Sequence, residues 1–174
     1  MKKFVLVLAV LCVMTSAFCV IQVNVIGSVN KPVSSLYDSY QEDPSSLIEI
    51  AKADYEAGLQ FRFMDSGFDL GIEGAVSVKE EGYTPVLRAF AGLNVPLFGF
   101  VNLGNAIGYE IRLTEGEYAQ TPYYRFSGGI GLGIFDLEIY ALMPVSFENG
   151  FVEALNIGNK LSSATVGVAA GFQF

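Results

Sequence analysis

Apolar and polar residues alternate with a period of two along most of this chain. In the segment 68–79, Phe68 and Leu70 share one face, and Asp69 and Glu73 share the opposite face. A two-residue period is that of a β-strand whose two faces meet different surroundings. Eight segments show it: 21–25, 53–63, 68–79, 87–95, 101–112, 124–134, 136–145 and 164–174. We therefore predict an all-β fold, an antiparallel up-and-down barrel of about eight strands.

The apolar face of these segments carries no charged residue, but alternation alone fits two kinds of barrel. A soluble lipocalin-like barrel turns its apolar face inward, whereas a transmembrane barrel turns it toward lipid. Three features favour the transmembrane barrel: glycines crowd the polar face, most odd-numbered links are long while the even-numbered ones are short, and aromatic residues lie near the strand ends. The links that we expect are 31–50, 64–67, 80–83, 96–100, 114–122, a tight turn at Phe135, and 146–160.

The composition supports a membrane protein. Hydrophobic residues make up 52% of the 174 residues and charged residues 16%, with a mean hydropathy of +0.44. After the N-terminus, no uninterrupted apolar run reaches the roughly 20 residues that a membrane helix needs. Only helices and closed barrels satisfy every backbone hydrogen bond inside lipid, so a barrel is the architecture that remains.

The N-terminus is typical of an export signal. Lys2 and Lys3 supply the positive charge, and residues 4–14 form the apolar core. We therefore expect a signal peptide, residues 1–19, followed by a membrane β-barrel, residues 20–174.

Signal cleavage is expected after Ala17 or Cys19, where small residues precede the first strand. Two alternatives use the same segment: a single membrane anchor, for which the apolar run is short, and lipidation of Cys19. The residue before a lipidated cysteine is normally small, and here it is Phe18. Because Cys12 and Cys19 both lie in this segment, we expect no disulfide in the mature chain.

Charged residues of the predicted strands fall on the polar, inward face. They are seven acids and six bases: Lys52, Asp54, Glu56, Arg62, Asp69, Glu73, Lys79, Arg88, Glu110, Arg112, Arg125, Asp136 and Glu138. An eight-stranded barrel is just wide enough for its own side chains, so a balanced set should form a hydrogen-bonded network that closes the lumen. The network that we predict comprises Arg62, Asp69, Glu73, Arg88, Glu110, Arg112, Arg125 and Glu138.

The short turns set the expected register of this network. The pairs that follow are Phe63 with Phe68, which places Arg62 opposite Asp69, and Val95 with Val101, which places Arg88 diagonal to Glu110.

The end of the last predicted strand, residues 166–174, carries Phe172 and Phe174 on its apolar face. This ending resembles the terminal strand of bacterial outer-membrane barrels, which the barrel-assembly machinery recognises. The resemblance implies that Phe172 and Phe174 form an assembly signal and that the protein resides in a bacterial outer membrane. In architecture, the whole mature chain resembles the small eight-stranded outer-membrane proteins of the OmpX, OmpW and OmpA-barrel type.

Catalysis has little support in the sequence. The chain contains no His, which removes the usual general base. Among outer-membrane barrels, the lipid A acyltransferase, the lipid A deacylase and the omptin protease use His-dependent sites, as the resemblance implies, so we expect no enzyme. The glycine-rich run 128–133 lacks a following helix and a P-loop Lys, and we expect no cofactor. With no His or mature-chain Cys as ligands, we also expect no metal site.

The partners that we expect are outer-membrane lipid, the barrel-assembly machinery and a surface ligand held by the outer loops. Removal of Lys2 and Lys3 takes the formal charge from −8 to −10, which argues against nucleic acid. Acidic outer loops could bind divalent cations or a basic partner, although a solvated surface is the simpler interpretation.

The leading functional hypothesis is a structural or surface-interaction protein with a closed polar interior. One alternative is a small OmpW-like pore or conduit for small or apolar solutes, which Leu36, Tyr37 and Leu47 in the first long link would permit. A second alternative is a soluble periplasmic lipid-binding barrel.

Overall fold

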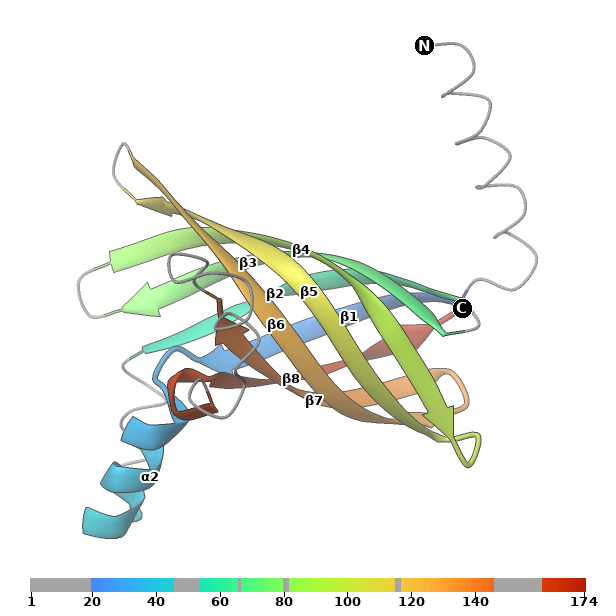
Figure 1. Ribbon diagram of the computed structural model, residues 1–174, viewed down its shortest axis with the longest axis horizontal. Coiled ribbons are helices and arrows are strands. Elements are labelled where there is room, and N and C mark those ends of the chain that lie inside the picture. Colours follow the sequence, from blue (N-terminus) through green and yellow to red (C-terminus); the bar gives the residue numbers. More distant parts are fainter. Residues whose placement is uncertain (1–19, 46–53, 66, 80–81, 115–116, 146–160) are drawn as a thin grey trace.

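The protein forms a closed β-barrel of eight strands, shown by a computed structural model that describes residues 20–45, 54–65, 67–79, 82–114, 117–145 and 161–174. Every strand pairs antiparallel with its sequence neighbours, and the last returns to the first (Figure 1). The strands are β1 Val20–Val29, β2 Asp54–Asp65, β3 Phe68–Lys79, β4 Gly82–Leu97, β5 Val101–Thr114, β6 Glu117–Leu132, β7 Phe135–Pro144 and β8 Thr165–Gln173. The predicted all-β, up-and-down barrel of eight strands is confirmed. The predicted signal peptide, residues 1–19, and its cleavage site lie outside the described residues.

The two faces of the strands are exchanged relative to an ordinary soluble domain. Along β3, burial alternates residue by residue: Asp69 and Glu73 are buried inside the barrel, whereas Leu70 and Ile72 are exposed on its outer surface. The same holds on β1, where Gln22 is buried and Ile21 exposed. The polar interior and apolar exterior therefore follow the two-residue period that the sequence shows.

Met143 and Val145 depart from this pattern. Their place in the alternation predicts exposure on the outer face, but both are buried. Met143 lies near the end of β7 and Val145 directly follows that strand, which also contacts the 3₁₀ helix η1, Leu161–Ser163. Alternation does not fix the environment there, because the helical turn η1 lies beside the end of the strand.

The predicted register at both short turns is wrong by two residues. Across the β2–β3 turn, Asp65 pairs with Phe68, so Arg62 lies opposite Gly71 and diagonal to Asp69. The turn is tighter than the four residues expected, and Gly67 adopts a φ of 101°, which a glycine tolerates.

The β4–β5 turn shows the same shift. Leu97 pairs with Val101, which places Arg88 directly opposite Glu110 instead of diagonal to it. Because a shift of two residues preserves the side-chain parity, every inward residue stays inward in both hairpins.

The predicted long link 114–122 is also wrong, because most of it is strand. Tyr118 pairs with Leu113, and β6 continues through Pro122. Proline has no backbone N–H and is therefore rare inside a sheet. The carbonyl of Pro122 accepts a hydrogen bond from Val145 N at 2.8 Å, just beyond the end of β7. The missing N–H therefore removes only the last hydrogen bond between β6 and β7. The β3–β4 and β5–β6 links, which lie at the same end of the barrel, are therefore tight hairpins.

A helix lies within the first long link, where no helix is predicted from the sequence. Helix α2, Val33–Glu42, follows Pro32, whose fixed φ suits a helix start. It extends beyond one end of the barrel, whereas the C-terminus lies at the other end (Figure 1). We call these the helix end and the turn end. Among the described residues, no helix is long and apolar enough to cross a membrane.

Two hydrogen bonds hold the start of α2, and the Asp43 carboxylate accepts two more just beyond the end of the helix. Val33 N donates to Ala164 O at 2.8 Å, and Ser34 Oγ donates to Ser162 O at 2.8 Å. Beyond the helix, the hydroxyl and backbone N–H of Ser45 donate to the Asp43 carboxylate at 2.7 and 2.9 Å, which lowers the pKa of Asp43.

Inward glycines make room for the aromatic rings of the core. Phe90 lies directly opposite Gly71, and a Cβ at Gly71 would meet that ring at 2.1 Å. Tyr140 lies opposite Gly167 in the same way, and a Cβ at Gly167 would meet its ring at 2.4 Å. Each ring therefore covers a neighbouring backbone that has no side chain, and the narrow lumen is filled at these levels.

Candidate functional site

The barrel interior holds the most distinctive chemistry of the described chain, a connected network of nine charged side chains. Its members are Glu56, Arg62, Asp69, Glu73, Arg88, Glu110, Arg112, Arg125 and Glu138. They come from six strands, β2 to β7, so the ion pairs cross the lumen as well as joining neighbours. We call this set the interior network.

Toward the helix end, two arginines share three carboxylates. Arg88 donates to Glu56, to Glu110 at 2.6 Å and to Glu73 at 3.4 Å. Arg112 donates to Glu110 and Glu56, each at 2.6 Å. Since Glu56 is two strands away from Arg88 and three from Arg112, these contacts exist only because the barrel is closed.

Toward the turn end, Arg62 holds two carboxylates at once. Its Nε donates to Asp69 Oδ1 at 3.0 Å, and its Nη2 donates to Oδ2, which gives a two-pronged ion pair. The remaining Nη1 donates to Glu138 across the lumen. Arg62 therefore joins β2 to both β3 and β7.

Arg125 links the two halves of the interior network. Its guanidinium donates to Glu73 and to Glu138, each at 2.6 Å. Its Cζ atom lies 4.1 Å from the centroid of the Tyr140 ring and 4.7 Å from that of Phe90. Only 1% of Arg125 is exposed, so both cation–π contacts form away from solvent, where they are strongest.

Charged side chains can be buried in this interior because each arginine forms ion pairs with at least two carboxylates. Bringing ions out of water is costly, and the mutual attraction offsets that cost only when the geometry and hydrogen bonds are good. Each carboxylate of the interior network accepts from at least one arginine, and several of these ion pairs join side chains from opposite walls of the barrel. Chemically, such an interior is suited to closing a lumen.

All eight residues predicted for the interior charge network lie in the interior and take part in it. The prediction omitted Glu56, which the alternation had placed on the inward face. Its partners Arg88 and Arg112 are far from it in any flat arrangement of hairpins, so pairing across short turns gave no signal for it.

The two predicted assembly-signal residues lie at the turn end. Phe174 exchanges backbone hydrogen bonds with Ile21, at 2.8 and 3.1 Å, which closes the barrel. Phe172 faces outward and its ring packs against Phe135 at 5.1 Å between centroids. Both side chains are exposed, so they contribute little to the core.

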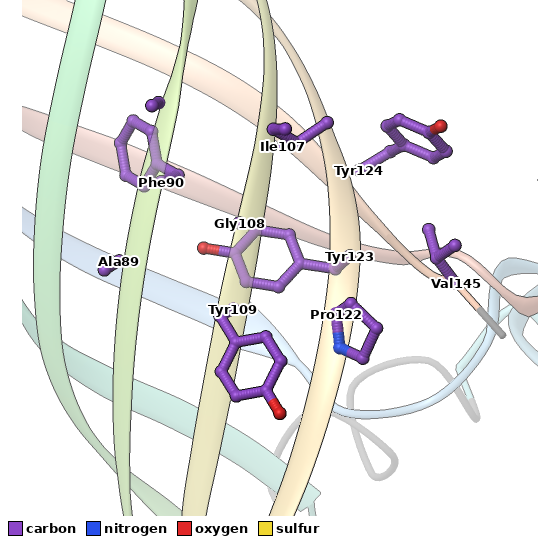
Figure 2. A pocket seen from close by; sticks show the side chains of 10 residues that line it. Ala89, Phe90, Ile107, Gly108, Tyr109, Pro122, Tyr123, Tyr124 and Val145 are labelled. Carbon is purple, nitrogen blue, oxygen red and sulfur yellow. The ribbon is translucent and has the colours of Figure 1, made fainter. Parts of the chain in front are cut away.

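An apolar recess of about 530 Å³ lies across β4, β5 and β6 (Figure 2). On the outer face, the small side chain of Ala89 lies opposite Tyr109, and the ring of Tyr123 lies against Gly108, which has no side chain (Figure 2). No charged residue lines it, and its walls are apolar like the rest of the outer surface.

Comparison with known proteins finds no matching family model and no matching curated protein.

Proposed function

We propose that this protein is an integral outer-membrane β-barrel with a structural or surface-interaction role and a closed polar interior. The observation that carries the proposal is the apolar exterior. Val25 on β1, Ile72 on β3, Ile107 on β5 and Ile139 on β7 lie on four sides of the barrel, and each is more than half exposed. Water would make so large an apolar surface unfavourable, whereas lipid would cover it.

Aromatic residues at both ends of this exterior support the proposal. Exposed rings at the turn end are Phe63, Phe68, Phe98, Phe100, Phe135, Phe172 and Phe174, and those at the helix end are Tyr55, Tyr83, Tyr109 and Tyr118. Girdles of this kind flank the apolar band of membrane barrels. The proposed partners are outer-membrane lipid and the barrel-assembly machinery.

Helix α2 supports the surface-interaction role. It carries exposed Tyr37 and Tyr40 and has no buried residue. At the helix end, it would present these rings to a surface ligand beyond the lipid. We propose no enzymatic activity, since the carboxylates of the interior network are held by arginines.

The membrane location is tested by fractionation of the native host and by gel mobility. A barrel closed by strand pairing resists SDS at room temperature and unfolds on boiling, so we expect the two samples to migrate differently. The protein should remain with outer-membrane fragments after a carbonate wash. Recovery in the soluble periplasmic fraction, with identical mobility before and after boiling, would support the soluble lipid-binding barrel instead.

The closed lumen is tested by planar-bilayer recordings of the purified protein. Because the interior network spans the cross-section, we expect no sustained single-channel current at moderate voltage. Arg88→Ala, which removes three ion pairs from that cross-section, should raise the frequency of brief openings. Stable channels in the wild-type protein would favour the conduit for small solutes.

A further inference from the structure

An unpaired amide side chain interrupts the apolar outer surface of the barrel. Asn105 lies on the outward face of β5 and is exposed. Phe100 at the turn end and Tyr109 toward the helix end lie on either side of it along the chain, and both are exposed. At about 3.3 Å per residue, Asn105 is roughly 13–17 Å along the strand from each of them. It therefore lies inside the band between the two aromatic girdles, where lipid would surround it.

The outward neighbours of Asn105 are all apolar. Leu93 on β4 and Phe126 on β6 lie directly opposite it in the strand register. Leu103 and Ile107, two residues away on β5, are 48% and 64% exposed. Within the part of the chain that the structure describes, the Asn105 side chain makes no hydrogen bond. Hydrocarbon offers an amide neither a donor nor an acceptor, so an unsatisfied amide at this depth is costly.

The other outward amide side chain of the described strands is held within its own barrel. Gln120 on β6 accepts a hydrogen bond from the Tyr109 hydroxyl at 2.8 Å. Asn105 has only hydrocarbon side chains opposite it on both adjacent strands. Its partner must therefore come from another molecule, and that partner must both donate and accept to satisfy a carboxamide.

The outer surface beside Asn105 is hollowed. Asn105 lines a recess of about 680 Å³, together with Leu93, Leu103, Phe126, Gly128, Ile139 and Ala141. The small residues Gly128 and Ala141 leave this space open. Further along β5 toward the helix end lies the recess of Figure 2, which Ile107 lines. The amide therefore lies between two hollows that can receive apolar side chains from a second protein surface.

We propose that two copies of this protein associate in the membrane through the outer face of β4, β5 and β6, with their Asn105 side chains paired at a two-fold axis. Each amide donates one hydrogen bond to the other copy and accepts one from it, so both are satisfied. The inference rests on the proposed membrane location.

A second copy fits this face better than a lipid does. Two barrels inserted in the same direction present each residue at the same depth, so Asn105 of one copy meets Asn105 of the other when the axis passes between them. The ester groups of a phospholipid can only accept, and they lie at the membrane surface and not between the girdles.

The first test is cross-linking of the protein in phospholipid vesicles. Asn105→Cys, in a chain with Cys12 and Cys19 replaced by Ser, places a single thiol at the proposed axis. Oxidation with copper phenanthroline should produce a reducible band at twice the mass on a denaturing gel. Val25→Cys is the matched control, because β1 lies across the closed barrel from β5 and Val25 is 63% exposed. It should give at least about fivefold less dimer.

The second test measures association by energy transfer between donor-labelled and acceptor-labelled barrels in vesicles. Asn105→Leu, of similar volume, should weaken dimerisation at least about fivefold, since it removes the paired amides. Gly128→Phe should also weaken it by filling the recess; a Cβ there meets Leu103 in ordinary contact at 3.7 Å, so the barrel accommodates the change. Gln120→Leu makes the same chemical change at an amide with a partner in its own barrel, and it should leave dimerisation unchanged.

The outcomes separate the dimer from the membrane location. A protein that stays in the membrane fraction with heat-dependent gel mobility, yet is monomeric at every protein-to-lipid ratio, would overturn the dimer alone. Equal cross-linking through Val25→Cys and Asn105→Cys, or unchanged association of Asn105→Leu, would also overturn it. A phospholipid that copurifies with the wild-type protein but not with Asn105→Leu would assign this face to lipid instead. Recovery in the soluble fraction would overturn the location and the dimer together.

Discussion

Arg125→Ala is expected to destabilise the barrel by about 3–5 kcal/mol, because it leaves Glu73 and Glu138 without their shared partner. The substitution also removes the stack between Phe90 and Tyr140. Far from solvent, no water replaces these contacts. The measurement is urea unfolding in detergent micelles, followed by circular dichroism or by the fraction of the compact gel band.

The matched control is Arg112→Ala. The Arg112 side chain also meets two carboxylates, but it is 27% exposed, so water can take its place, and Glu56 and Glu110 both keep Arg88 as a partner. We expect a loss of about 1 kcal/mol there. Equal effects of the two substitutions would mean that burial does not set the strength of the interior network. If Arg125→Ala did not change the free energy of unfolding, the interior network would not stabilise the barrel.

Phe174→Asp is expected to lower the amount of protein in the outer membrane several-fold, with degradation products in the periplasm. The reason is recognition by the assembly machinery, which the resemblance of the C-terminal strand implies. The Phe174 side chain is 77% exposed, and its backbone bonds to Ile21 do not require the ring. The purified variant should therefore refold in detergent nearly as well as wild type. Immunoblots of membrane fractions and refolding yields measure the two effects.

Phe98→Asp is the control for this prediction. Phe98 is 88% exposed at the same end of the barrel, and its positive φ of 54° suits Asp at least as well as Phe. We expect normal insertion. If Phe98→Asp lowered insertion as much as Phe174→Asp, a charge at the turn end would explain both, and the assembly-signal interpretation of Phe174 would be wrong.

The sequence by itself determined the strands and which way their side chains point. Alternation of Asp69 with Leu70, and of Gln22 with Ile21, needs only the two-residue period of a strand. That assignment survived a register error of two residues in two hairpins, because such a shift never moves a side chain to the other face. Glu56 and Asp136 were likewise assigned inward without knowledge of their partners.

The tertiary structure decided which inward residues meet. Glu56 reaches Arg112, and Arg62 reaches Glu138, because closing the sheet brings side chains from opposite walls into a narrow lumen. A prediction that pairs strands only across their short turns cannot show which residues on opposite walls of the barrel come close together. The continuation of β6 through Pro122 depended on where β7 ends, and α2 depended on contacts with Ala164 and Ser162 at the far end of the chain.

Two buried amide oxygens, Gln22 Oε1 and Asn24 Oδ1, show the same limit. Gln22 and Asn24 are ordinary polar residues in the sequence, and nothing local marks their oxygens as unsatisfied. Only the closed barrel brings their amide nitrogens to Gln173 and Gln60 and leaves their oxygens without a hydrogen-bond donor among the described residues. The two-residue period fixes a side chain's direction locally, whereas satisfaction of a buried polar atom depends on every strand that surrounds it.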